Sequence, residues 1–71
     1  MKINKLQKSI TLMRLSPENS EEYWEFHKAA HYYELATFYK NNNANNHRAR
    51  MTAIRAYKKG MTLKDKREAQ K

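Results

Sequence analysis

The chain contains one glycine and one proline in 71 residues, and this scarcity of helix-breaking residues constrains its fold more than any other feature. Glycine and proline are the least favourable residues in a helix interior, by about 1 and about 3 kcal/mol relative to alanine. No segment shows a strand pattern, so nearly every stretch can propagate a helix. The sequence therefore predicts an all-α protein: an antiparallel helical hairpin with an N-terminal amphipathic helix, in a small three-helix arrangement.

The first predicted helix covers about residues 2–14, where apolar residues recur at helical spacing and form one face. These residues are Ile3, Leu6, Ile10 and Met13. Ser16, Pro17 and Glu18 then match an N-cap, a first-turn proline and an acid that suits the helix dipole. They predict that a second helix begins at this point and runs to about Lys40.

The second predicted helix carries two apolar stripes, and a helix that is apolar on two sides normally packs between two partners. One stripe consists of Phe26, Ala29, Ala30, Tyr33 and Ala36. The other is aromatic and consists of Trp24, Tyr32, Leu35 and Tyr39. We expect the first stripe to pack on a third helix, and the aromatic stripe to be a protein interface with the first helix, a target protein or a second copy. Because one short helix cannot cover so much apolar surface, we expect a homo-oligomer.

An asparagine-rich segment, residues 41–46, predicts the turn of the hairpin, because asparagine tolerates left-handed backbone and caps helices well. A third helix is expected from about Asn46 to Lys59, with Gly60 as the glycine that follows its last turn. Its small side, which should approach the small residues of the second helix closely, consists of Ala49, Ala53, Ala56 and Tyr57. Residues 1–60 would form a single helical domain, and residues 61–71 a basic C-terminal tail that is a short helix or disordered.

The stretch Tyr32-Tyr33-Glu34-Leu35-Ala36, Tyr39, the short polar turn and the alanines that follow it form a recognisable pattern. Through these features residues 32–57 resemble a single helical hairpin of the tetratricopeptide type. The resemblance implies a surface for protein recognition. Several such repeats are needed to form the usual binding groove, and the resemblance covers a single hairpin.

The net charge of +8 is unevenly distributed along the chain. Residues 1–16 carry four basic and no acidic side chains, and residues 17–40 carry five of the seven acids against two lysines. Residues 41–71 carry nine lysines or arginines against two acids. Two basic ends favour a polyanionic partner such as nucleic acid or an anionic membrane surface. Alternatively, the acidic middle pairs with the basic ends and the excess charge serves solubility.

The clearest candidate binding site is a basic stripe on the third helix, where Arg48, Arg55 and Lys59 share the side opposite the alanines. Arginine in the first turns opposes the helix dipole, so helix stability does not account for it. We expect contacts with nucleic-acid phosphates that are tolerant of sequence. The candidate residues are Arg48, Arg50, Arg55, Lys58, Lys59, Lys64, Lys66 and Arg67. A solvated helix face would carry the same residues.

Catalytic and metal-binding patterns receive little support. His27, His31 and Glu34 share one side of the second helix, and histidines four residues apart can reach one metal ion. Ordinary exposed or partly packed histidines remain the preferred interpretation, because the chain has no cysteine and carries lysines on the same helix. Glycine-rich phosphate loops and nucleophile motifs are absent from the sequence. We therefore expect a non-enzymatic protein without a metal or another cofactor.

Two functional hypotheses remain open. The first is an accessory protein that binds nucleic acid through the third helix and both basic ends, and the second is a protein–protein interaction module or inhibitor that uses the aromatic stripe. No apolar run approaches the roughly 20 residues that span a bilayer, and basic residues interrupt the N-terminal apolar positions, so we expect a cytoplasmic protein. The many lysines and asparagines would suit an AT-rich genome such as that of a phage.

Overall fold

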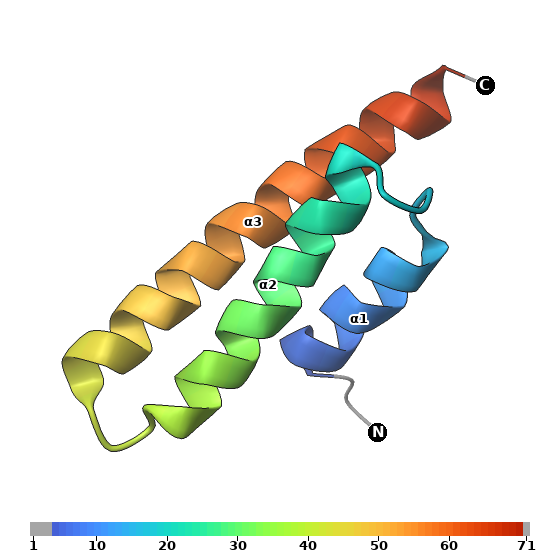
Figure 1. Cartoon of the computed structure of the whole chain (residues 1–71). Coiled ribbons are helices and arrows are strands. Elements are labelled where there is room, and N and C mark those ends of the chain that lie inside the picture. The colour runs from blue at the N-terminus through green and yellow to red at the C-terminus, as the bar shows by residue number, and fades with distance from the viewer. Residues whose placement is uncertain (1–3, 71) are drawn as a thin grey trace.

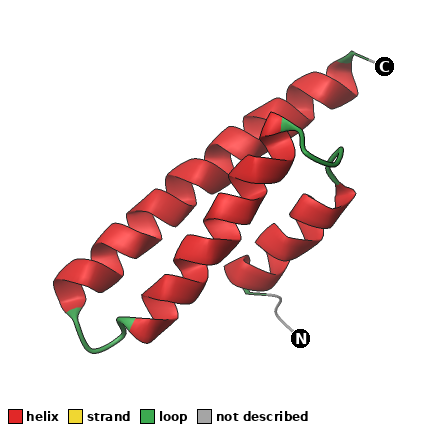
Figure 2. Cartoon of the chain, in the orientation of Figure 1, coloured by secondary structure: helices red, strands yellow, loops and turns green. Residues whose placement is uncertain are grey.

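The computed structural model describes residues 4–70 and contains three helices (Figure 1). They are α1 (Lys5–Leu15), α2 (Glu21–Phe38) and α3 (Asn43–Ala69). Helices make up 84% of the described residues, no strand occurs among them, and short loops join the helices (Figure 2). The predicted all-α class and the small helical arrangement are confirmed.

Helix α2 lies in the middle of the molecule, with α3 antiparallel to it on one side and α1 on another (Figure 1). The 27 residues of α3 correspond to about 40 Å at 1.5 Å per residue, and they account for most of the 45 Å length of the molecule. Because α1 packs mainly on α2, it covers one side of the α2–α3 hairpin. The opposite side of the hairpin is not covered by any described residue.

The core is narrow and is built from alanines around one phenylalanine. Phe26 is fully buried, and the ring of Tyr57 on α3 meets it edge-on with the ring centroids 5.9 Å apart. The buried alanines on the two helices are Ala29, Ala30, Ala36, Ala49, Ala53 and Ala56. Small side chains let two helix backbones approach closely, as the sequence predicts for this hairpin.

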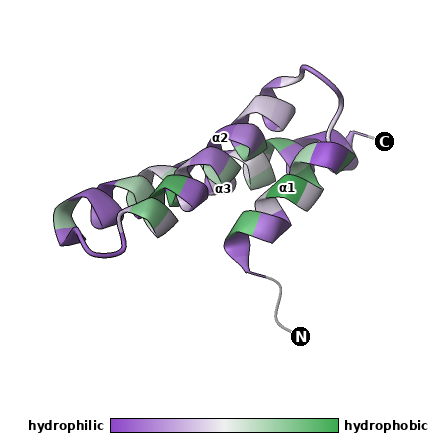
Figure 3. Ribbon diagram, turned by 60° about the horizontal axis from the view of Figure 1, so that its bottom comes forward, coloured by the Kyte–Doolittle hydropathy of each residue, from purple (hydrophilic) through white to green (hydrophobic). Residues whose placement is uncertain are grey.

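The first helix docks through a small residue as well as through its apolar face. Ser9 is fully buried, and its hydroxyl donates to the carbonyl of Lys5 within the same helix. Asn4 caps α1 by accepting a hydrogen bond from the amide of Gln7. In Figure 3 the exposed turn between α2 and α3 is purple, whereas α1 carries much of the green, apolar colour. The predicted start of the first helix, with Ile3, lies outside the described residues.

The start of the second helix differs from the prediction. Ser20, rather than Ser16, is the N-cap of α2, and its side chain accepts from the amide of Tyr23. Asn19 stands before it in the left-handed region, with φ of 63°, which interrupts the helical path. Ser16 is instead the C-cap residue of α1. The prediction that the helix begins at Ser16 and Pro17 is therefore wrong, because the loop between α1 and α2 occupies these residues.

The turn between α2 and α3 is shorter than the asparagine-rich segment. Tyr39 is the C-cap residue of α2, and Asn42 is the N-cap of α3, where its side chain accepts from the amide of Asn45. The side chain of Asn46 donates a 2.8 Å hydrogen bond to the carbonyl of Ala36 across the turn. Asn43, Asn45 and Asn46 therefore lie in the first turn of α3.

The third helix is longer than predicted. It continues through Gly60 to Ala69, and Gly60 is buried in its interior. A Cβ atom at this position would lie 2.8 Å from Cε1 of Phe26 and 2.9 Å from its Cζ. The prediction that the helix ends at Lys59 is wrong, because Gly60 makes room for the Phe26 ring and does not terminate the helix.

Candidate functional site

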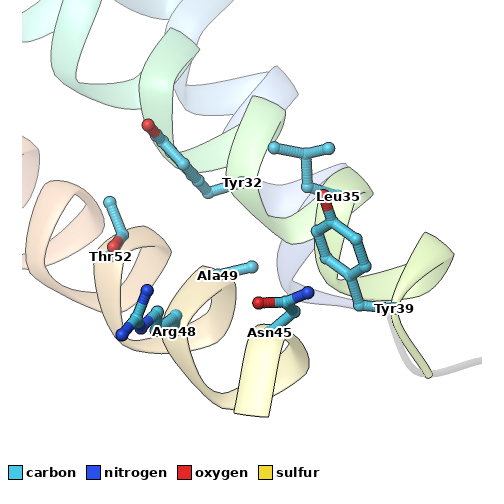
Figure 4. A pocket seen from close by; sticks show the side chains of 7 residues that line it. All are labelled: Tyr32, Leu35, Tyr39, Asn45, Arg48, Ala49 and Thr52. Carbon is cyan, nitrogen blue, oxygen red and sulfur yellow. The ribbon is translucent and has the colours of Figure 1, made fainter. Parts of the chain in front are cut away.

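Part of the aromatic stripe of α2 lines one wall of a groove, and Arg48 of the basic stripe of α3 lines the opposite wall (Figure 4). The pocket at the turn end of this groove has a volume of about 280 Å³. Its lining residues are Tyr32, Leu35 and Tyr39 from α2, and Asn45, Arg48, Ala49 and Thr52 from α3. Two patterns that the sequence assigns to separate hypotheses therefore belong to one surface.

The groove continues along the helices from Thr52 into a second hollow of about 240 Å³. This hollow is lined by Glu25, Lys28, Thr52, Arg55, Ala56 and Lys59. We call both hollows together the α2–α3 groove. It lies on the side of the hairpin that α1 does not cover.

The positive charge of the α2–α3 groove that is not offset by an ion pair among the described residues comes from its two arginines and from Lys28. Among residues 4–70, neither Arg48 nor Arg55 forms an ion pair. Lys59, by contrast, places Nζ 3.4 Å from Oε1 of Glu21 and 3.8 Å from Oε1 of Glu25. The acids at the start of α2 thus offset the charge of Lys59 at the far end of the groove.

The aromatic wall combines one accessible ring with two half-buried side chains. Tyr39 is 37% exposed, while Tyr32 and Leu35 are intermediate. Figure 4 shows the ring of Tyr39 broadside and that of Tyr32 edge-on, both on the opposite side of the groove from Arg48. The groove therefore offers an aromatic surface and a cation to the same ligand.

Two of the candidate basic residues are held in ion pairs on α3. Lys64 Nζ lies 2.7 Å from Oε1 of Glu68, and this hydrogen bond raises the pKa of Lys64. Arg67 donates hydrogen bonds to both carboxylate oxygens of Glu22, with its Nε 2.9 Å from Oε1 and a terminal guanidinium nitrogen 3.1 Å from Oε2. Arg67 thus joins the end of α3 to the start of α2, a structural role that the sequence does not indicate.

The carboxylate of Glu22 is 5% exposed, and its charge is balanced by neighbouring donors. The hydrogen bonds from Arg67 lower its pKa most, burial opposes them, and the Ser16 hydroxyl contributes a further lowering. That hydroxyl lies 2.7 Å from Oε2 of Glu22 and 2.8 Å from the carbonyl oxygen of Leu12, so its one hydrogen serves one acceptor at a time. Paired in this way, Glu22 stays ionised in the folded protein.

The remaining candidate basic residues do not extend the groove into one continuous surface. Arg50 lies in a separate hollow with Lys5 and Tyr33, between α1 and the hairpin. Lys58 and Lys66 are exposed. Of the predicted basic residues, the structure therefore brings together Arg48, Arg55 and Lys59.

Trp24 is separated from the other members of its predicted stripe. It is 50% exposed, and it does not line the α2–α3 groove. Its ring instead meets Tyr23 edge-on at 5.0 Å and His27 at 5.3 Å between centroids. The predicted interface stripe thus divides into the groove wall and a half-exposed aromatic cluster of Tyr23, Trp24 and His27.

The two histidines of α2 and Glu34 share one side, as the spacing predicts, and that side faces α1. They line a hollow with Leu6, Ile10 and Met13. Within residues 4–70, no group of three or more histidine, cysteine, aspartate or glutamate side chains is arranged to hold a metal ion. The part of the chain that the structure describes also contains no helix long and apolar enough to cross a membrane.

The sequence analysis did not single out Lys28 and Asn45 as site residues. The sequence pattern that could have identified them is a spacing of alternately four and three residues, which keeps side chains on one face of a helix. On α2 this face carries Lys28, Tyr32, Leu35 and Tyr39, and on α3 it carries Asn45, Arg48, Thr52, Arg55 and Lys59. Both faces show the spacing of a helix–helix contact but hold polar and aromatic residues, and in the structure they line the α2–α3 groove.

No known protein family, curated protein or solved structure matches the chain. The resemblance of the hairpin to a tetratricopeptide repeat stays a prediction.

Proposed function

We propose that this protein is a non-enzymatic accessory protein that binds nucleic acid through the α2–α3 groove, without strong sequence preference. One observation carries the proposal: Arg48 and Arg55 have no ion-pair partner within residues 4–70, and they line the same groove as the aromatic wall of α2. Phosphate contacts from arginine position a nucleic acid without reading its bases. Such a protein would act in the cytoplasm.

The charge around the groove supports a polyanionic ligand. From Leu35 to Lys64 the chain carries seven basic and no acidic residues. This interval contains the turn and all the basic residues that α3 contributes to the groove. A ligand rich in phosphate releases counterions when it binds such a surface, and this release supplies most of the affinity that is independent of sequence.

The proposal predicts a salt-dependent affinity that depends on the two groove arginines. If the wild type neutralises four to six phosphates, the slope of log K against log salt on duplex should be roughly −3 to −5, at about 0.9 per phosphate. The double variant Arg48→Ala with Arg55→Ala should flatten this slope by about two units. Adding Lys59→Ala should change it little further, because Glu21 and Glu25 already offset that charge. Fluorescence anisotropy with unrelated duplex and single-stranded oligonucleotides at several salt concentrations measures these slopes.

A charge-matched control uses Lys8→Ala with Arg14→Ala, two exposed residues of α1 outside the groove. This variant loses the same net charge, but it should change the slope by less than half as much. Equal effects of the two double variants would show that net charge, rather than the groove, determines affinity. Failure of the wild type to bind any oligonucleotide at low salt would discard the proposal.

A second proposed function is favoured by the cluster of Tyr23, Trp24 and His27. A half-exposed tryptophan that is fixed by two neighbouring rings resembles the aromatic anchors of protein interfaces. Leu15, at the same end of the molecule, is 68% exposed. The partner on this surface would be a second copy of the chain or a target protein.

A further inference from the structure

The two walls of the α2–α3 groove repeat with the same period. On α2, Tyr32 and Tyr39 are seven residues apart, and on α3 the same separation divides Arg48 from Arg55. Seven residues are close to two helical turns, or about 10.5 Å along each axis. Because α2 and α3 run antiparallel, the groove presents two aromatic rings and two arginines in matched spacing along its length.

A ligand that uses both walls must offer flat unsaturated rings as well as negative charges. Unpaired nucleic-acid bases provide such rings, and stacking on an aromatic side chain is tolerant of sequence because every base has a π-face. Bases inside a duplex are already stacked, and exposing one requires that its pairing and stacking be broken. A duplex would therefore contact the arginines and leave the aromatic wall unused.

We propose that the α2–α3 groove prefers single-stranded nucleic acid over duplex, with Tyr39 stacking on an unpaired base and Arg48 contacting a neighbouring phosphate. The inference deepens the proposed function and rests on it. Tyr39 is the better stacking residue, because it is 37% exposed whereas Tyr32 is half-buried. Tyr32 and Leu35 form the apolar floor beside it, and Asn45 and Thr52 supply polar groups along the opposite wall.

The ends of the groove limit the length of the bound strand. Glu21 and Glu25, which pair with Lys59, place negative charge at the end of the groove far from the turn. A phosphate gains less beside a lysine that is already ion-paired, so the strand should occupy the part between Tyr39 and Arg55. Binding should accordingly saturate with a short oligonucleotide.

The test compares a labelled single-stranded oligonucleotide of mixed sequence with the blunt-ended duplex that it forms with its complement, by fluorescence anisotropy at low salt. The wild type should bind the single strand at least about fivefold more tightly than the duplex. Tyr39→Leu should weaken single-strand binding about tenfold, since stacking contributes about 1–3 kcal/mol per base. Duplex affinity should not change. Tyr39→Phe, which keeps the ring, should retain single-strand affinity.

Phe38→Leu is the matched control, because Phe38 is 78% exposed, neighbours Tyr39 in sequence and does not line the groove. It should leave both affinities unchanged, and circular dichroism should show equal helix content in all variants. Equal wild-type affinity for single strand and duplex, an effect of Tyr39→Leu on both ligands alike, or an equal effect of Phe38→Leu would each overturn the inference. In these cases the proposed function still stands. If the wild type bound neither the single strand nor the duplex, both the inference and the proposed function would be overturned.

Discussion

Glu22 is a carboxylate almost without access to water, and Arg67 reaches it from 45 residues further along the chain. Two parallel N–H···O bonds from one guanidinium match the geometry of a carboxylate and fix its orientation. Ser16 adds a donor from the end of α1. Residues at the ends of all three helices therefore contact one buried carboxylate, and these contacts link the helices at the end of the hairpin away from the turn.

Replacing Arg67 by methionine should destabilise the protein and lower the urea concentration at which it unfolds. The substitution leaves the carboxylate of Glu22, which is 5% exposed, without its two hydrogen bonds from the guanidinium. Urea denaturation followed by circular dichroism measures the change. Lys66→Met removes an exposed cation from the same turn of α3 and should stay within about 0.5 kcal/mol of the wild type. Similar losses in both variants would contradict the structural role of Arg67.

The same ion pair gives the stability a predictable dependence on pH. Because the pKa of Glu22 is lowered from its ordinary value of 4.5 in the folded protein, the unfolded chain binds more protons at this site. The contribution of Glu22 to stability is fully present above that ordinary value, and it is lost as the pH falls toward the lower folded pKa. Glu22→Gln should therefore lose less stability than the wild type between about pH 5 and pH 3. Parallel pH profiles of the two proteins would speak against this assignment.

At the scale of the helices, Gly60 shows that a glycine near the end of a helical pattern can either end the helix or allow close packing inside it. Glycine after a helical pattern commonly ends a helix, and that is what the sequence predicts here. The buried ring of Phe26 lies where a Cβ atom of residue 60 would stand, so glycine is needed for the contact between the helices. The continuous α3 depends on this contact to offset the low helix propensity of glycine.

Gly60→Ala should therefore destabilise the protein, although alanine is the better helix former. The gain in helix propensity is about 1 kcal/mol, whereas overpacking against a buried ring typically costs about 1–3 kcal/mol, so a net loss of about 1 kcal/mol is expected. In a Phe26→Leu background the ring is gone, and the same change should be neutral or stabilising. A double-mutant cycle from urea denaturation gives this coupling. Stabilisation by Gly60→Ala in the wild-type background would show that the ring shifts at little cost.

The hairpin and the composition of its faces can be predicted from the sequence by helical spacing alone. In the structure, residues at equal distances on either side of Asn42 face each other across the hairpin, whereas the predicted turn over residues 41–46 would shift these pairs by about three residues. Tyr39 and Asn45 are such a pair and line one pocket, and Glu25 and Lys59 are another and form an ion pair. The meeting of the aromatic and basic stripes follows from this symmetry, which uses only the position of the turn.

Other features could not be predicted, because local patterns offer equivalent alternatives that tertiary contacts decide. Ser16 and Ser20 are both suitable N-cap residues, and the hydroxyl of Ser16 is engaged by the Glu22 carboxylate and the carbonyl of Leu12. Arg67 looks like any other basic residue of a polar helix end until α2 is placed beside it. The role of Ser16 and the role of Arg67 both depend on the buried carboxylate of Glu22, which is distant from Arg67 in the sequence.

On the scale of the whole molecule, the two faces of the hairpin have different surroundings. α1 covers the side that carries Ala30 and the histidines, and the α2–α3 groove occupies the uncovered side. A chain of this length buries only about 60% of the surface that its unfolded form exposes, so substantial apolar surface remains outside. The half-exposed ring of Trp24 and the exposed Leu15 belong to this surface, at the end of the molecule away from the turn.

We expect the protein to self-associate through this end, and Trp24 to be the residue on which the association depends most. Tryptophan is enriched among the residues that dominate interface energies, and truncation of such an anchor typically costs about 2 kcal/mol or more, or about thirtyfold in affinity. Trp24→Ala should accordingly shift the wild type toward monomer in sedimentation velocity at high micromolar concentration. Phe38→Ala, which removes a more exposed ring at the opposite end of α2, should leave the distribution unchanged.

Because Trp24 does not line the groove, its loss should leave the intrinsic affinity of each protomer for single-stranded oligonucleotides intact. A wild type that sediments as a monomer throughout this concentration range would contradict the expectation, and Trp24 would then be available to a different protein partner.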